Sequence, residues 1–313
     1  MNIDKISEYF GILAISSEML NAGHINRTFL LTDGNGERYI LQSLNGNVFR
    51  RPEIVMQNIS AAETALSGCD KINIPHYLLS GDKNYITDDG EIWRMYRYTE
   101  KCGDADSYGT GFAFGSFIKA MNGCKLAAET SIENFHNYQA YLTRLKSAAG
   151  NTDISRFIKL GEHLTDIFNA DIPERIIHGD AKTANVIAGQ KYTVIDLDTI
   201  MYGYAALDYG DMVRSVCGKT IDFQAVHDLT KGFGEGLEGL LTKKENVSLF
   251  SGILWVTGEL AMRYMTDYLT KEGYFTNKTP EQCLERAEEL CRLLDSFMRN
   301  ENDLKCIIYD CLR

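Results

Sequence analysis

Short runs rich in aromatic and aliphatic residues, separated by turn residues, recur along the first hundred positions, which is typical of β-strands. The turn sequence DGNG separates two such runs, RTFLLT and ERYILQSL, and predicts a β-hairpin. Further strands are predicted for IPHYLLS and for NYITDDGEIWRMYRY, which folds back at residues 88–90. A helix is predicted for RPEIVMQNISAAETALSG, since Pro52 suits its first turn and Gly68 its end. A shorter helix is expected over residues 3–14.

The pattern changes after Tyr98, where a polar connection leads into segments with apolar residues at three- and four-residue steps. This helical spacing covers residues 108–170 and returns over residues 220–300. Between them, the stretch RIIHGDAKTANVIAGQKYTVIDLD predicts short apolar strands around a His-Gly-Asp turn and a second turn. We therefore expect an α+β fold of two lobes. Residues 1–97 would form a small antiparallel β-rich lobe with one helix, and residues 98–313 a larger, mainly helical lobe with an inserted hairpin.

Composition narrows the class of protein. The 313 residues are 44% hydrophobic and 24% charged, as in soluble globular proteins. The net charge of −11 repels phosphate backbones, so nucleic acid is not an expected partner. We expect neither a signal peptide nor a membrane span, because the N-terminus has no basic and apolar leader and no run approaches eighteen apolar residues. The eight cysteines lack zinc-finger spacing and C-x-x-C pairs, which favours free thiols in a cytoplasmic protein.

Three polar residues stand where the strands of the inserted hairpin begin or end. Asp180 follows the first strand, Asn185 comes five residues later, and Asp196 closes the strand YTVID. Pairing through the turn at residues 189–190 brings Asn185 beside Asp196, and amide and carboxylate oxygens suit Mg²⁺. Asp180 can then accept a proton from an incoming hydroxyl. Each residue alone is an ordinary turn residue, but the three together predict phosphoryl transfer.

The segments HGDAKTAN and VIDLD resemble the catalytic and metal-binding segments of the aminoglycoside phosphotransferase and choline kinase superfamily. The resemblance implies a bilobal protein-kinase-like fold that uses ATP and Mg²⁺. It places the base at Asp180 and the metal ligands at Asn185 and Asp196. His178 opens the motif, and we expect it to support the loop. The sequence leaves the choice between ATP and GTP open.

The first lobe would then hold the nucleotide. The loop NAGHIN would lie over the phosphates, where Asn26 and Thr28 can donate hydrogen bonds, although it lacks G-x-G-x-x-G and a Walker A lysine. The segment WRMYRYTE would be the hinge between the lobes, with adenine bound by its backbone around Tyr96 and Tyr98.

Charge in this lobe departs from the kinase pattern. The third strand of kinases usually carries a lysine that pairs with phosphates and with a helix glutamate. Here the strand YILQSL has Gln42, and Glu63 on the next helix has no obvious lysine partner. More of the neutralisation must then come from Mg²⁺ and backbone amides. In the second lobe, ALDYGDMVR contains Asp208 and Asp211, and the superfamily uses an aspartate here to brace the catalytic loop. An ion pair with Arg214 is compatible with that role.

A narrower resemblance concerns the acceptor. Three segments are similar to the N-acetylhexosamine 1-kinases: GHINRTFLLTDGNGERYILQSLN, IDLDTIMYGYAALDYGDMVRS and FSGILWVTGELAMRYMTDYLTKEGYF. The resemblance implies that His24, Asp180, Arg263 and Tyr274 contact the sugar and that its anomeric C1 hydroxyl is phosphorylated. Arg263 and Tyr274 lie eleven residues apart, too far for one helix face, but Gly273 permits a bend.

Two other functions stay open at this point. One is a kinase of an amine-bearing alcohol, such as an aminoglycoside or choline; the acidic composition permits it, and Arg263 in the pocket disfavours it. The other is a nucleotide-binding protein without activity, which the missing lysine favours and the set of Asp180, Asn185 and Asp196 disfavours. The sequence ranks neither N-acetylglucosamine against N-acetylgalactosamine nor one oligomeric state against another.

Overall fold

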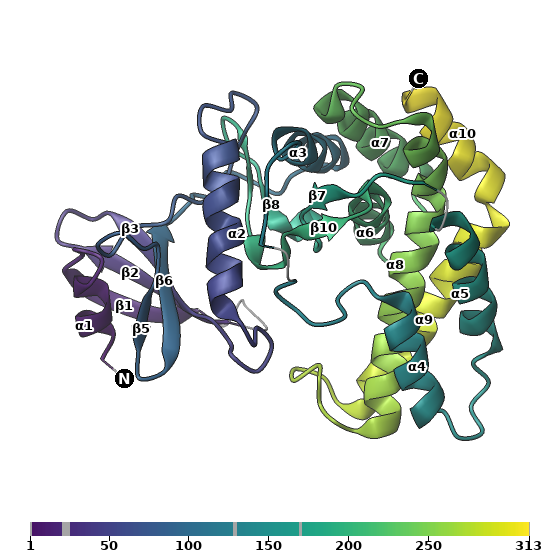
Figure 1. The fold of residues 1–313 in the computed structure, drawn as a ribbon, viewed down its shortest axis with the longest axis horizontal. Helices are drawn as coiled ribbons and strands as arrows, with labels where there is room; N and C mark the ends of the chain where they lie inside the picture. The colour runs from purple at the N-terminus through teal and green to yellow at the C-terminus, as the bar shows by residue number, and fades with distance from the viewer. Residues whose placement is uncertain (1, 21–25, 128–129, 169–170, 313) are drawn as a thin grey trace.

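The computed structural model describes residues 2–20, 26–127, 130–168 and 171–312. A β-sheet with a short helix against it lies at one end of the molecule, and helices make up most of the other end (Figure 1). Helix α2, Pro52–Ala65, stands between these two parts. It begins at the predicted proline, and the predicted α+β class is confirmed.

The sheet is antiparallel, with the strand order β1-β2-β3-β6-β5. Its strands are β1 Ala14–Leu20, β2 Arg27–Asp33, β3 Arg38–Ser43, β5 Ile86–Asp88 and β6 Glu91–Arg97. Strands β2 and β3 pair Phe29 with Leu41 across the DGNG turn, and β5 and β6 pair Asp88 with Glu91. Both predicted hairpins are confirmed.

Two predictions for this part are wrong. Helix α1, Ile3–Glu8, is shorter than predicted, and Ala14–Leu20 forms the edge strand β1. Five consecutive residues of β1 are exposed, so its sequence lacks the alternation of a half-buried strand. The segment IPHYLLS makes only isolated bridges, such as Tyr77 with Tyr96, and no regular strand.

The two faces of the sheet have different surroundings. The apolar side chains of one face pack against Ile6 of α1 and Phe10 just after it. The sheet residues in this cluster are Phe29, Leu31, Tyr39, Leu41, Trp93 and Met95. Side chains alternate along a strand, so Thr28, Gln42 and Arg94, which are neighbours in register, project together from the opposite face. This second face carries the polar groups that the sequence assigns to the nucleotide.

The helical part contains α3 Ser107–Ala120, α4 Tyr138–Ala148, α5 Ser155–Phe168, α6 Ala205–Cys217, α7 Phe223–Leu237, α8 Lys243–Thr270, α9 Pro280–Arg299 and α10 Glu301–Cys311. Short strands lie among these helices, as Figure 1 shows. Their bounds are β4 Ile72–Asn73, β7 Arg175–Ile177, β8 Val186–Ile187, β9 Tyr192–Val194 and β10 Met201–Gly203. The antiparallel pair β8–β9 is the predicted inserted hairpin, and β10 pairs with β7. Across the described residues, every helix is too short or too polar to span a membrane.

Helices α6 and α8 cross at glycines. A Cβ on Gly252 would lie 1.9 Å from the backbone oxygen of Ala206, and a Cβ on Gly210 would lie 2.3 Å from the backbone oxygen of Gly252. Both distances are far below van der Waals contact, so this crossing requires glycine. The crossing fixes α6, whose first turn carries Asp208, against the long helix α8.

We expect Gly252→Ala to lower the free energy of unfolding by up to about 2 kcal/mol. Forcing the helices apart costs up to about 3 kcal/mol, which exceeds the gain of about 1 kcal/mol from placing alanine in a helix. Urea denaturation measures the change. The matched control is Gly103→Ala, because Gly103 has open space around its Cβ position and is exposed. Equal stability of the two variants would contradict the tight crossing.

Candidate active site

The segment His178-Gly179-Asp180 follows β7 and forms a tight turn. Gly179 has φ +82°, and a Cβ on it would lie 2.5 Å from the backbone oxygen of Thr199, so glycine is required here. The ring of His178 is fully buried, with its Nε2 donating to the backbone oxygen of Ile195 at 2.9 Å. His178 therefore supports the loop, as the resemblance implies, and does not face the solvent.

An aspartate of α6 supports this turn through two hydrogen bonds. The carboxylate of Asp208 accepts hydrogen bonds from the backbone N–H groups of His178 and Gly179, each at 2.8 Å. Asp211 instead pairs with Arg214 at 2.7 Å. From the sequence, either aspartate could brace the loop or pair with Arg214. In the structure Asp208 braces the loop and Asp211 forms the ion pair.

His136 holds the same turn from the other side. Its Nε2 donates to the backbone oxygen of Gly179 at 2.7 Å, and its Nδ1 faces the carboxylate of Glu259 at 3.3 Å. Burial by itself lowers the pKa of His136, but the Glu259 carboxylate and the Gly179 carbonyl outweigh it and raise the pKa to about 9. Sequence reasoning missed His136, because no local motif marks it.

Asp180 projects beyond the turn with a defined set of partners. Its Oδ2 accepts hydrogen bonds from Lys182 Nζ at 2.6 Å and from Asn185 Nδ2 at 3.0 Å. Burial raises the pKa of Asp180, but the charge and hydrogen bond of Lys182 more than offset this, so the pKa lies below its usual range. The carboxylate is therefore ionised at neutral pH. Lys182 stands inside the motif HGDAKTAN, where its position two residues after Asp180 could have drawn attention to it.

The hairpin brings the predicted metal ligands together. Val186 pairs with Val194, and the N–H of Ile195 donates to the backbone oxygen of Asn185 at 3.0 Å, so Asn185 lies beside the residue before Asp196. Asn185 uses its Nδ2 to donate to Asp180, which leaves its Oδ1 for another partner. This adjacency is the one that the spacing predicts.

Asp196 has an unusual backbone and a carboxylate without partners. Its φ of 63° lies in the left-handed region, and its carboxylate makes no hydrogen bond or ion pair with the other described residues. The side chain is exposed to solvent, yet protein surrounds it on several sides. This desolvation, together with the charges of Asp198 and Asp180, raises the pKa of Asp196 to about 6.

These residues fit a hard divalent cation. Asn185 offers an amide oxygen, and Asp196 offers a carboxylate without a hydrogen bond or ion pair to the described residues. Mg²⁺ accepts such ligands together with phosphate oxygens. The described residues contain no cluster of three or more His, Cys, Asp or Glu side chains that would enclose a metal by themselves. A cation here would depend on oxygens from a bound ligand.

The predicted phosphate contacts of the first lobe belong to one hydrogen-bond network. Gln42 Nε2 donates to Thr28 Oγ1 at 3.1 Å, and Gln42 Oε1 accepts from Arg94 Nη2 at 2.8 Å. Asn26 Nδ2 donates to Asp198 Oδ2 at 2.7 Å. Arg94 Nη1 donates to Asp198 Oδ1 at 2.5 Å and completes the connection. Sequence reasoning missed Arg94 and Asp198, although a polar residue inside an apolar strand and a second acid in VIDLD were visible.

The expected hinge follows β6. Tyr96 lies on the second face of the sheet, with its ring 5.0 Å from that of Tyr77. The N–H of Tyr98 donates to the backbone oxygen of Arg38 at 2.9 Å, so this group continues the sheet pairing. Adenine binding by the backbone of this segment stays a prediction.

A pocket beside α8 holds two of the predicted sugar contacts. Its lining is Tyr141, Arg144, Arg263, Thr266, Asp267 and Tyr274. Arg263 Nη2 donates to the Tyr274 hydroxyl at 2.8 Å, and the chain bends as predicted at Gly273, which has φ +68°. Asp267 is not the ion-pair partner of Arg263, because it accepts the backbone N–H groups of Tyr274 and Phe275. His24 lies outside the described residues.

This pocket is connected to the catalytic turn through two consecutive residues. The guanidinium of Arg263 lies 5.8 Å from the ring centre of Phe135, and His136 bonds to Gly179. Rings of Tyr141, Tyr274 and Phe275 also lie within 6 Å of the guanidinium. Among the described residues, no carboxylate forms an ion pair with Arg263, so it presents a positive charge held between aromatic faces.

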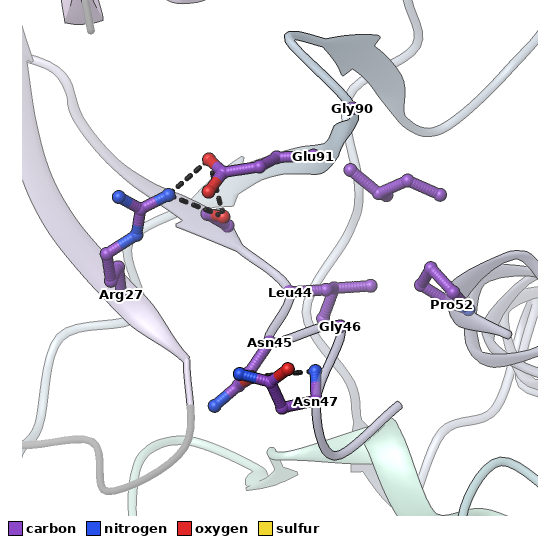
Figure 2. A pocket seen from close by; sticks show the side chains of 10 residues that line it. Arg27, Leu44, Asn45, Gly46, Asn47, Pro52, Gly90 and Glu91 are labelled. Carbon is purple, nitrogen blue, oxygen red and sulfur yellow. Dashed lines mark hydrogen bonds and ion pairs between the residues drawn. The ribbon is translucent and has the colours of Figure 1, made fainter. Parts of the chain in front are cut away.

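A larger cavity of about 420 Å³ lies at the end of the sheet. Figure 2 shows Arg27 with Glu91 on one side of it and Asn45 with Asn47 on the other. None of the residues of the catalytic turn or the hairpin lines it. The cavity touches the network only indirectly, because the N–H of Asn45 donates to Asn26 Oδ1 at 3.1 Å.

Comparisons with known proteins identify a family and a fold. A family model described as the phosphotransferase enzyme family matches residues 18–240. A microcompartment-associated aminopropanol kinase has a similar structure, with a TM-score of 0.68 and 16% identity over 99% of this chain and 98% of that chain. An aminoglycoside phosphotransferase from Alicyclobacillus acidocaldarius has a TM-score of 0.66 and 12% identity over 99% and 97%.

Amicoumacin kinase in complex with AMP-PNP, Ca²⁺ and Ami has a TM-score of 0.62 and 14% identity over 89% of this chain and 88% of that chain. At these identities the likeness establishes a shared fold. The predicted bilobal, kinase-like architecture is confirmed.

The His136–Glu259 pair makes stability depend on pH. The pKa of His136 is raised from 6.5 to about 9 in the folded protein, so its contribution is complete below pH 6.5 and is lost as the pH rises through about 9. The stability advantage of the wild type over His136→Gln should therefore shrink over this interval by an amount on the order of 3 kcal/mol.

Urea denaturation at several pH values measures this difference. The control is His227→Gln, since His227 is a half-exposed histidine of α7 beside Asp228. It should keep the pH dependence of the wild type. A constant difference between the wild type and His136→Gln from pH 6 to 10 would show that His136 is not charged in the folded protein.

Proposed function

Because the chain belongs to the phosphotransferase enzyme family, we propose that it is a kinase that uses ATP and Mg²⁺ to phosphorylate the anomeric C1 hydroxyl of an N-acetylhexosamine. The observation that carries the first half of this proposal is the arrangement of Asp180. It is an ionised carboxylate, oriented by Lys182 and Asn185, near Asp196, which has no hydrogen bond or ion pair with the described residues. A base next to a pair of hard oxygen ligands is what transfer of a phosphoryl group to a hydroxyl requires.

The residues divide the chemistry between them. The acceptor oxygen attacks the γ-phosphorus of ATP, the bond to the β–γ bridging oxygen breaks, and ADP leaves. Asp180 orients the hydroxyl and takes its proton. Asn185 fixes the rotation of the Asp180 carboxylate through its Nδ2. Mg²⁺, held by Asn185 and Asp196 when bound, would neutralise the phosphates. Lys182 adds a positive charge 2.6 Å from the base.

The two parts of the chain would hold the two substrates. We assign the nucleotide to residues 1–97, whose second sheet face carries Thr28, Gln42 and the side chain of Tyr96. We assign the acceptor and the chemistry to residues 98–313. The proposed nucleotide contacts are Asn26, Thr28 and Gln42, and each already makes a hydrogen bond to another protein group. They would therefore contact phosphate while keeping these bonds, of which the one from Asn26 reaches Asp198.

The chemistry of the pocket around Arg263 indicates which acceptor substrate binds. Its guanidinium is packed against four aromatic rings and has no carboxylate partner among the described residues, so it repels an ammonium group. A neutral sugar with an acetamido carbonyl accepts its hydrogen bonds instead. This favours an N-acetylhexosamine over an amine-bearing alcohol, although several structural neighbours are kinases of such amines.

Asp180→Asn should lower kcat by about 100-fold or more, because the amide cannot take the proton. Binding of Mg²⁺ with a non-hydrolysable ATP analogue, measured by calorimetry, should change little. The control is Asp303→Asn, an exposed aspartate of α10, which should keep the wild-type rate. Turnover by Asp180→Asn above about a tenth of the wild-type rate is incompatible with a base at this position.

Arg263→Met should raise the KM for N-acetylglucosamine or N-acetylgalactosamine by about 10-fold or more, since hydrogen bonds from a charged donor are lost. The matched control is Arg144→Met. Arg144 lines the same pocket but pairs with Glu272. A panel of sugars, aminoglycosides and choline, followed by ³¹P NMR of the products, identifies the acceptor and the phosphorylated position. Phosphorylation of amines alone would establish the alternative function.

A further inference from the structure

Arg94 occupies a position next to that of the lysine which the sheet lacks. It lies on β6, directly opposite Gln42 of β3, and projects from the same face of the sheet. Its guanidinium donates twice to Gln42 Oε1, from Nε at 3.1 Å and from Nη2 at 2.8 Å. A third bond runs from Nη1 to Asp198 Oδ1 at 2.5 Å. The side chains of Arg94 and Asp198 are 1% and 4% exposed, so this ion pair is buried.

The helix glutamate does not take part in this arrangement. Glu63 of α2 accepts the backbone N–H of Tyr77 at 2.9 Å and lies 3.2 Å from the His76 ring. A lysine–glutamate pair between β3 and α2 is therefore absent from the described residues. The buried ion pair of the sheet runs instead to Asp198, which lies in the turn Leu197–Thr199 two residues after Asp196.

Arg94 and Asn26 both bond to Asp198, which leaves Asp196 as the acid of the cleft that is open to a ligand. Asp198 has both carboxylate oxygens in use, Oδ1 by Arg94 and Oδ2 by Asn26. Asp196 makes no such bond with the described residues. Because two unpaired carboxylates two residues apart would repel each other, the Arg94 guanidinium offsets the charge of Asp198 and leaves the Asp196 oxygens open to a cation.

The turn that Arg94 holds is also fixed from the catalytic side. The backbone oxygen of Asp198 accepts from Ser131 Oγ at 2.7 Å, and Thr199 Oγ1 donates to the backbone oxygen of His178 at 2.9 Å. Asp196 therefore directly precedes a turn that is bonded to the sheet through Arg94 and to the catalytic loop through Thr199.

We propose that Arg94 is a positioning residue for the metal-binding segment, in place of a strand lysine paired with a helix glutamate. Through Asp198 it sets the position of the Asp196 carboxylate against the nucleotide-binding sheet. The inference rests on the proposed kinase function. Loss of Arg94 then weakens binding of the cation and of the metal–nucleotide complex, and affects the chemical step less.

The test separates this role from a contribution to folding. Removing one partner of a buried ion pair destabilises a protein, whereas replacing both by apolar residues often restores stability. The key variant is therefore the double substitution Arg94→Met with Asp198→Leu, compared with the wild type. The control is Arg292→Met on α9, because Arg292 is exposed and pairs with Glu288 outside the proposed nucleotide site.

Binding of Mn²⁺ in the presence of ADP, followed by electron paramagnetic resonance, needs no acceptor and no turnover. We expect the double variant to melt within about 4 °C of the wild type, to bind Mn²⁺ at least about 10-fold more weakly and to raise the KM for MgATP similarly, with a smaller change in kcat. Arg292→Met should match the wild type in each measurement. A stable double variant with wild-type Mn²⁺ binding would overturn the proposal.

If the double variant does not fold, Arg94→Lys gives the same decision. Lysine keeps the charge but cannot bond Gln42 and Asp198 together as the planar guanidinium does. It should fold and bind Mn²⁺ more weakly than the wild type; unchanged binding would overturn the proposal. Since these measurements use ADP alone, absence of kinase activity on every alcohol would refute the proposed function and leave the result for Arg94 standing.

Discussion

The carboxylate of Asp198 is almost completely removed from water, and a charge in that position has to be compensated by the protein. Its partners come from one side of the molecule, Arg94 from β6 and Asn26 from the position just before β2. The turn that carries it also meets α2, because Asn58 donates to the backbone oxygen of Ile200 at 3.1 Å. Hydrogen bonds to residues 198–200 thus fix the positions of the sheet, α2 and the catalytic turn relative to one another.

The acids of the cleft are sorted by their partners. Asp180 is matched by Lys182, Asp208 by backbone N–H groups, and Asp198 by Arg94. Asp196 alone among these four has no hydrogen bond or ion pair with the described residues. A uniform excess of negative charge would only raise the pKa values of all of them. The distribution of cations instead produces one ionised base and one open carboxylate at neighbouring positions, which is an arrangement able to receive a metal–nucleotide complex and a hydroxyl.

The catalytic hairpin and most of the first sheet could be predicted because their signals are local. Apolar, β-rich runs on either side of the DGNG turn identify β2 and β3, and the spacing across residues 189–190 places Asn185 beside Asp196. The edge strand β1 escaped prediction because it is exposed along most of its length and has no alternation. The bend that joins Arg263 to Tyr274 was readable only with a resemblance to supply the reason for pairing them.

The α+β class, the hairpin and the three residues that indicate phosphoryl transfer can be read from the chain, since each depends on neighbours a few positions apart. Packing of the elements was needed to show which aspartate braces the loop, what stands near the missing lysine and what supports the base. Arg94 meets Asp198 across 104 positions and His136 meets Glu259 across 123. Contacts of that range leave no periodic trace in the chain. They arise because buried charges must find partners once the elements have packed.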